Sequence, residues 1–89
     1  MFKETVTIQN KTGLHARPAS LFVEKVKCFS SEVYVAFPGN EPVSGKRILG
    51  ILTLAAEKGD TIEISAEGTD AEAAVTELVN LINSFNPNF

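Results

Sequence analysis

The only histidine of the chain, His15, stands two residues before Arg17 and three before Pro18, where a helix is predicted to begin. Proline is tolerated in the first turn of a helix, because the N–H that it lacks would have no intrahelical partner there. Apolar residues then recur with helical spacing, at positions 19, 22, 23 and 26. We therefore expect the imidazole beside free backbone N–H groups, at the positive end of a helix dipole.

These groups together could hold a phosphoryl group on His15. A neutral imidazole is a nucleophile, and the His15 ring is the only one in the chain. The backbone amides of Ala16 and Arg17 would face the phosphate oxygens. The Arg17 guanidinium could add a bidentate contact. From these residues alone, the competing interpretation is a solvated histidine beside a helix cap.

Residues 13–20 (GLHARPAS) resemble the phosphorylation segment of the HPr family, the histidine-containing phosphocarriers of the bacterial phosphoenolpyruvate–sugar phosphotransferase system. Residues 45–50 and 58–64 support the resemblance, which extends over essentially all 89 residues. It implies that Nδ1 of His15 accepts a phosphoryl group from enzyme I, charged from phosphoenolpyruvate, and passes it to IIA domains of sugar permeases. Such a protein is a carrier rather than an independent enzyme, and it needs no cofactor.

Three other interpretations stay open. A paralogue of the nitrogen-regulatory phosphotransferase system would use the same chemistry with a different donor and acceptor. A small-ligand-binding or metal-binding regulatory module is disfavoured, because one histidine and one cysteine give no ligand cluster, and we expect no metal site. A hydrolase of the acylphosphatase type would need a glycine-rich phosphate loop, for which residues 12–14 are too sparse.

Size and composition predict one small domain over residues 1–89. A net charge of −3 without a basic run argues against nucleic acid as a partner. The single cysteine, Cys28, excludes an intrachain disulfide. No apolar run is long enough to span a membrane, so we expect a cytoplasmic monomer without membrane insertion.

Hydrophobic periodicity predicts the element order β-α-β-β-α-β-α. We expect strands at residues 2–8, 32–37, 41–44 and 61–66, and helices at residues 16–27, 46–54 and after 69. Thr69 and Glu72 match a capping box at the start of the third helix, and residues 84–89 are expected to be a frayed tail. Each strand has one polar face, which predicts an α+β open-faced sandwich: a four-stranded antiparallel sheet with three helices on one face. The HPr resemblance implies the same fold.

The second helix has more aliphatic residues than one short helix can bury. With Ile51 and Leu54 in the core, the 100° step between residues leaves the opposite side exposed. An exposed aliphatic patch on a small domain is a candidate docking site. In HPr this helix, beside the active-site helix, is where other phosphotransferase proteins dock. The predicted partner surface comprises Arg17, Ser20, Ile48, Leu49 and Leu52.

One position departs from many members of the family. In HPr of many Gram-positive bacteria, an ATP-dependent kinase phosphorylates a serine at the start of the second helix. The matching residue here is Arg47, which cannot take a phosphate, and Ser44 is not expected to replace the serine. We therefore predict no regulatory serine. Arg47 would instead add a fixed positive charge that favours acidic partners.

Overall fold

The computed structural model describes residues 1–89, and its strands and helices follow the predicted order. The elements are β1 (Phe2–Thr7), α1 (Ala16–Val26), β2 (Glu32–Ala36), β3 (Val43–Ser44), α2 (Ile48–Leu54), β4 (Thr61–Glu67) and α3 (Ala71–Ser84). In β4 the buried and less buried residues alternate, as the period of two in its sequence predicts. No helix has the length and apolar character that crossing a membrane requires.

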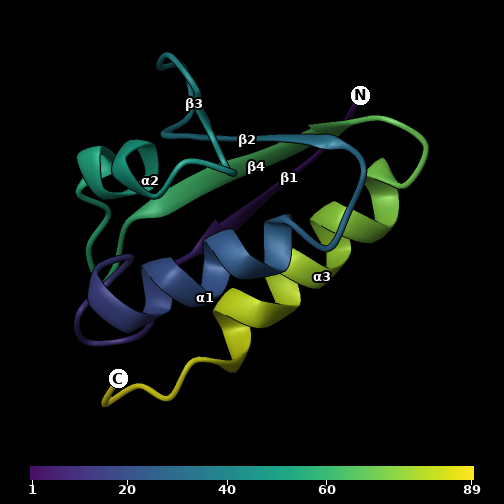
Figure 1. The fold of residues 1–89 in the computed structure, drawn as a ribbon. Helices are drawn as coiled ribbons and strands as arrows, with labels where there is room; N and C mark the ends of the chain where they lie inside the picture. The colour runs from purple at the N-terminus through teal and green to yellow at the C-terminus, as the bar shows by residue number, and fades with distance from the viewer.

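The four strands form one antiparallel sheet in the order β1-β4-β2-β3. Val6 of β1 lies opposite Ile62 of β4, and Val35 of β2 lies opposite Ile64. Helices α1 and α3 lie side by side across one face of the sheet, and the short helix α2 lies near β3 and the start of α1 (Figure 1). The predicted fold class, an open-faced sandwich with a four-stranded antiparallel sheet and three helices, is confirmed.

The core lies between the sheet and the two long helices. Phe22 of α1 and Leu78 of α3 are fully buried there with Ile62 and Ile64 of the central strand β4. The predicted inner stripe of the third helix is also buried, at Ala71, Val75, Leu78 and Ile82. Both long helices therefore pack against the sheet, and this packing sets the position of α1 and of its first residues relative to the sheet.

Helix α2 begins at residue 48, two residues later than predicted. Residues 45–47 form a turn instead, because Ser44 accepts two backbone hydrogen bonds there. The Lys46 N–H donates to the Ser44 hydroxyl at 3.2 Å, and the Arg47 N–H donates to the Ser44 carbonyl at 3.3 Å. Arg47 consequently stands at the N-cap of α2 rather than inside the helix.

The predicted capping box at the start of α3 is wrong. The N-cap is Asp70, not Thr69, and its side chain caps no helix amide. The Asp70 carboxylate instead accepts hydrogen bonds from the backbone N–H and the hydroxyl of both Ser30 and Ser31, in the connection between α1 and β2. Four donors from another part of the chain thus outcompete the helix amides.

These hydrogen bonds make the free energy of unfolding depend on pH in the acid range. The Ser31 hydroxyl, with help from the Ser30 N–H, lowers the pKa of Asp70 from 3.8 to about 2. Since the folded-state pKa lies below the unfolded value, the contribution of Asp70 is complete above about pH 4 and is lost as the pH falls toward 2. We expect Asp70→Asn to melt at a lower temperature at pH 7 and to lose less stability than the parent between pH 4 and pH 2. Thermal unfolding followed by circular dichroism across this range checks both expectations. If the melting temperatures of the parent and of Asp70→Asn fell equally between pH 4 and pH 2, Asp70 would not be the source of the acid dependence.

The sequence predicts a frayed tail at residues 84–89, whereas the structure packs residues 85–89 against the rest of the molecule. Phe85 is only 7% exposed, and its ring meets that of Phe89 edge to face, with 5.6 Å between centroids. Residues 85–89 also hydrogen-bond to the loop between β1 and α1. Two aromatic side chains can bury enough apolar surface to hold so short a segment against the molecule.

Candidate functional site

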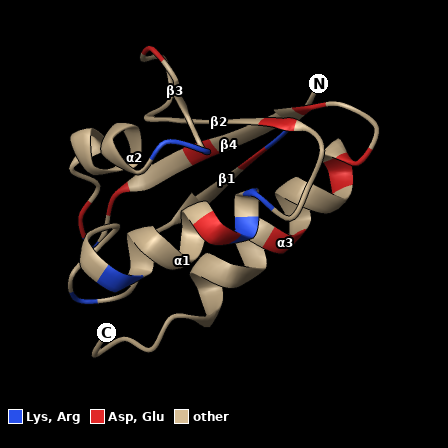
Figure 2. Cartoon of the chain, viewed as in Figure 1, with Lys and Arg blue, Asp and Glu red and all other residues tan.

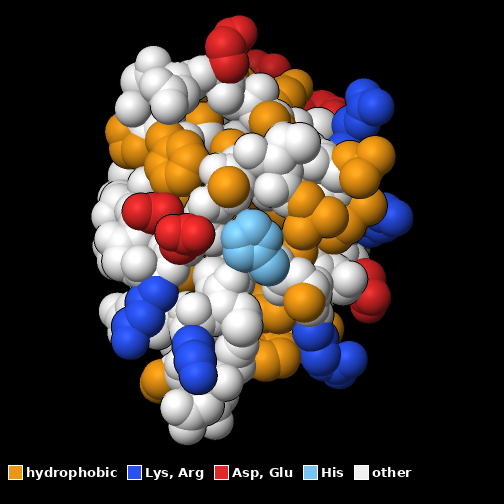
Figure 3. Space-filling view, turned by 90° about the vertical axis from the view of Figure 1, so that its left-hand side faces the viewer, with side chains coloured by type: hydrophobic (Ala, Val, Ile, Leu, Met, Phe, Trp, Pro, Cys, Tyr) orange, Lys and Arg blue, Asp and Glu red, His pale blue; other side chains and the backbone are white.

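His15 is the N-cap residue of α1, as the sequence predicts. Its backbone is extended, with φ −127° and ψ 165°, and its side chain makes no capping hydrogen bond. The ring is half-buried. Figure 3 shows it at the surface, with hydrophobic side chains on one side and acidic side chains on the other. Because capping does not occupy the imidazole, its nitrogens are available for chemistry.

The backbone directly after His15 is unusual. Ala16 has a positive φ of 51°, a conformation that costs a residue with a Cβ some energy. The amides of Ala16 and Arg17 come before the first intrahelical hydrogen bonds, and neither donates to another backbone group. The structure therefore places His15 beside two unpartnered N–H groups, as predicted. An anion on the ring could accept hydrogen bonds from them.

The loop before His15 is packed against the connection between α2 and β4. Leu14 is fully buried, and its N–H donates to the carbonyl of Ala56 at 3.0 Å. Gly13 has a φ of 68° and touches the backbone of Ala56 so closely that a Cβ would overlap the carbonyl. Only glycine fits this contact. Leu14 thus anchors the loop inside the molecule, and His15 follows it toward solvent.

Arg17 and Ser20 are both exposed on the first two turns of α1. Arg17 takes part in no ion pair, and no hydrogen bond of its guanidinium is found. A cation in the first turn of a helix opposes the dipole, so the charge of Arg17 does not stabilise this helix. Its guanidinium is free to meet an anion two residues from the imidazole.

The exposed side of α2 carries the aliphatic patch that the sequence predicts. Leu49 is 73% exposed and Ile48 is 37% exposed, whereas Ile51 is fully buried. Leu52 differs in part from the expectation, because it is half-buried and packs against the core. Since α2 contacts α1, the patch and His15 belong to the same end of the molecule (Figures 1 and 3).

Arg47 is exposed at the start of α2 and has no ion-pair partner, whereas its neighbour Lys46 pairs with Glu32 at 3.2 Å. Arg47 and Leu49 line one shallow hollow of about 330 Å³ between α2 and β3. Basic residues thus occur both at the start of α1 and beside α2 (Figure 2). Position 47 thus has no hydroxyl that a kinase could phosphorylate, and the charge of Arg47 borders the aliphatic patch.

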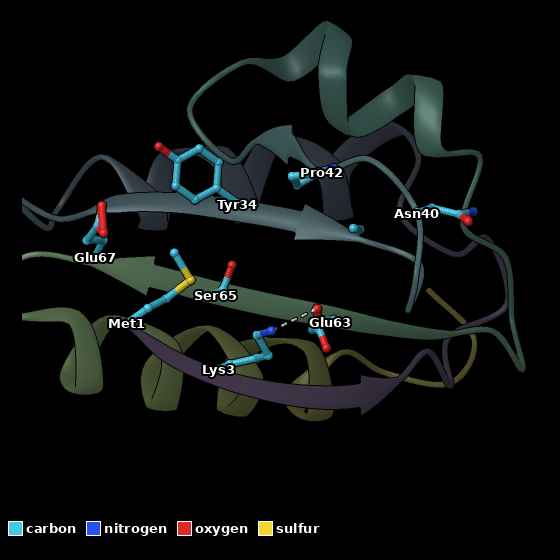
Figure 4. A pocket seen from close by; sticks show the side chains of 9 residues that line it. Met1, Lys3, Tyr34, Asn40, Pro42, Glu63, Ser65 and Glu67 are labelled. Carbon is cyan, nitrogen blue, oxygen red and sulfur yellow. Dashed lines mark ion pairs between the residues drawn. The ribbon is translucent and has the colours of Figure 1, made fainter.

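A second hollow, of about 360 Å³, lies on the face of the sheet that the helices leave open (Figure 4). Tyr34 and Ser65 border it, together with an ion pair in which Lys3 Nζ lies 3.8 Å from Glu63 Oε1. These side chains form no nucleophile–base pair and are remote from α1. No group of three His, Cys, Asp or Glu side chains in residues 1–89 could hold a metal ion.

Comparison with known proteins identifies the family of this chain. The family described as "PTS HPr component phosphorylation site" matches residues 2–84. The chain belongs to the HPr family. The phosphocarrier protein HPr of Neisseria meningitidis serogroup A is 41% identical over 85 residues, which cover 96% of this chain and 94% of that protein. The resemblance to HPr that residues 13–20 carry is therefore confirmed.

Solved HPr structures also share the fold. A crystal structure of HPr from Thermoanaerobacter tengcongensis has a TM-score of 0.89 and 48% identity, covering 94% of this chain and 93% of that one. A structure of an HPr dimer from the same organism has a TM-score of 0.73 and 48% identity, covering 94% and 95% of the two chains. Phosphocarrier proteins HPr are thus among the relatives of this chain.

Sequence reasoning missed Asn10, a buried residue that shapes the loop before His15. Its side-chain Nδ2 donates to the Gly13 carbonyl at 2.9 Å, and the residue is 1% exposed. An asparagine just before a glycine turn commonly bonds the local backbone, so the signal was present in residues 10–13. Ala16, by contrast, gives no sign in the sequence of its positive φ.

Proposed function

We propose that this protein carries a phosphoryl group on His15, taking it from phosphoenolpyruvate-charged enzyme I and passing it to IIA domains of sugar permeases. The proposal depends on one observation: the His15 side chain makes no capping hydrogen bond, and the next two backbone amides, of Ala16 and Arg17, have no partner. Membership of the HPr family supports the same chemistry. The protein would act as a cytoplasmic monomer between these partners.

The transfer is a displacement at phosphorus between two histidines. The lone pair of a neutral His15 nitrogen forms a P–N bond as the P–N bond to the donor imidazole breaks, and the donor nitrogen keeps the electron pair. The amides of Ala16 and Arg17 and the Arg17 guanidinium would hold the three phosphoryl oxygens. The reverse displacement on an acceptor histidine uses the same groups, so no nucleotide is consumed at this site.

Water must be kept from the phosphoryl group while two proteins meet. The aliphatic side chains of Ile48, Leu49 and Leu52 could form that contact next to His15, with Arg17 and Ser20 from α1 completing it. The exposure of Leu49 favours this role, because an apolar side chain that is mostly solvated in the free protein gains by burial in a complex.

Phosphoryl labelling tests the proposal directly. The protein is incubated with labelled phosphoenolpyruvate and a bacterial enzyme I. We expect one phosphoryl group per chain, labile to acid and stable to base, which chases onto an added IIA domain. A protein that takes no label from enzyme I would contradict the assignment to the sugar branch. Label from the nitrogen-branch donor alone would identify the paralogous system.

Leu49→Glu tests the proposed partner surface. A carboxylate in an apolar contact should raise the Kd for enzyme I about tenfold to a hundredfold, because burying a polar group without a partner costs about 1–3 kcal/mol. The melting temperature should change little, since Leu49 is 73% exposed. Asn80→Glu, an exposed position on α3, is the matched control and should bind normally. A large fall in melting temperature of Leu49→Glu would instead place this residue in the core.

A further inference from the structure

The C-terminal segment, residues 85–89, reaches from the end of α3 to the loop that leads into His15. In Figure 1 the C-terminus lies beneath the start of α1. The N–H of Lys11 donates to the carbonyl of Pro87 at 2.9 Å, and the hydroxyl of Thr12 donates to the carbonyl of Phe89 at 2.6 Å. Two consecutive loop residues are therefore tied to the far end of the chain.

The segment has enough structure of its own to act as a fixed support. Phe85 is buried, and its edge-to-face contact with Phe89 places the second ring against the core. Asn86 closes a turn, because its side-chain oxygen accepts from the Asn88 N–H and its carbonyl accepts from the Phe89 N–H, both at 2.8 Å. The carbonyls of Pro87 and Phe89 are thus presented to the loop at defined positions.

A short chain of hydrogen bonds leads from this segment toward His15. The Thr12 hydroxyl, bound to Phe89, also accepts from Asn10 Nδ2 at 3.5 Å. The same Nδ2 donates to the carbonyl of Gly13 at 2.9 Å. On its other side the loop is held through Leu14 by Ala56. The His15 side chain makes no hydrogen bond at the cap, so its place at the start of α1 depends on the backbone of this loop.

We propose that residues 85–89 form a C-terminal strap that holds the loop at residues 10–14, and with it the His15 ring, in the geometry that phosphoryl transfer requires. Thr12 is the positioning residue that connects the strap to the loop. The proposal rests on the proposed function for its effect on transfer. Reactions between bound groups depend steeply on orientation, so a loosened loop lowers the transfer rate without removing any reacting group.

The test uses Thr12→Val, which keeps the shape of the side chain and removes its hydroxyl. Amide hydrogen exchange at Lys11 should become faster, and single-turnover phosphoryl transfer from enzyme I slower, each by about twofold to tenfold, the range that one neutral hydrogen bond spans. The His15 ring signals in NMR spectra should shift or broaden. Thr12→Ser should restore all three, and Thr76→Val, on the exposed side of α3, should change none.

Phe89→Ala attacks the same link from the strap. If the strap acts through Thr12, the double variant with Thr12→Val should be no slower than the worse single variant, because both changes break one pathway. Unchanged exchange at Lys11 in both single variants would overturn the strap, and faster exchange with unchanged transfer would overturn its positioning role. A parent chain that takes no label would contradict the proposed function alone, since Lys11 exchange and the His15 ring signals decide the strap without phosphoryl transfer.

Discussion

Replacement of His15 by alanine is expected to abolish phosphoryl labelling from phosphoenolpyruvate and enzyme I completely. His15 is the only histidine of the chain, and its ring stands beside two unpartnered amides at the start of α1. The nearby hydroxyls of Thr12 and Ser20 cannot replace it, because a neutral hydroxyl with no adjacent base is a weak nucleophile. Labelled protein is counted after electrophoresis under basic conditions, which preserve a phosphohistidine.

Two controls make the loss of label decisive. The His15→Ala variant should unfold at nearly the parent temperature, because the ring is half-buried and caps no helix amide. Cys28→Ala removes the only thiol, which is exposed at the far end of α1, and should keep the full label. Label that persists in His15→Ala would overturn the site assignment, and label lost in Cys28→Ala would move the acceptor to the thiol.

The sequence predicts the layers of this fold well, because they depend on local periodicity. The alternation in β4 and the apolar stripe of α3 each decide which face of an element enters the core. Pro18 and the helical pattern after it place the start of α1 correctly. The position of His15 relative to that helix therefore follows from residues close to it in the chain.

Errors arise where distant residues compete for one partner. Asp70 accepts hydrogen bonds from Ser30 and Ser31, forty residues away, so a capping signal that is valid locally is not used. The C-terminal segment is likewise held by Lys11 and Thr12, which no local rule connects to it. Both contacts join segments that are far apart in the sequence, and local patterns contain no information about them.

The candidate site shows the same division. The exposure of Leu49 follows from the helical step, whereas Leu52 is half-buried because it packs against the core. The positive φ of Ala16 depends on how the loop enters α1, which is set by the contact of Leu14 with Ala56. Residue identity thus predicts the chemistry of the site, and long-range packing determines its geometry.

Arg17→Ala should slow phosphoryl transfer through His15 roughly 100-fold, the lower end of the range seen when one hydrogen-bond donor to developing charge is removed. Arg17 is the only cation within two residues of His15, and it has no partner in the free protein. Its guanidinium can therefore turn toward the phosphoryl oxygens without breaking another contact. Rapid-quench measurements of single-turnover transfer from enzyme I give the rate, and titration of enzyme I gives the apparent KM.

The division between rate and KM decides which role Arg17 has. A lower rate at saturating enzyme I means that Arg17 stabilises the moving phosphoryl group, whereas a higher KM alone would reduce it to a docking residue. Arg17→Lys should recover only part of the rate, because an ammonium group cannot contact two oxygens in the planar geometry of a guanidinium. The melting temperature of Arg17→Ala should be equal to the parent's or slightly higher, since removing a cation from the first turn of a helix relieves its repulsion with the dipole. An unfolded Arg17→Ala protein would show instead that the side chain serves the fold.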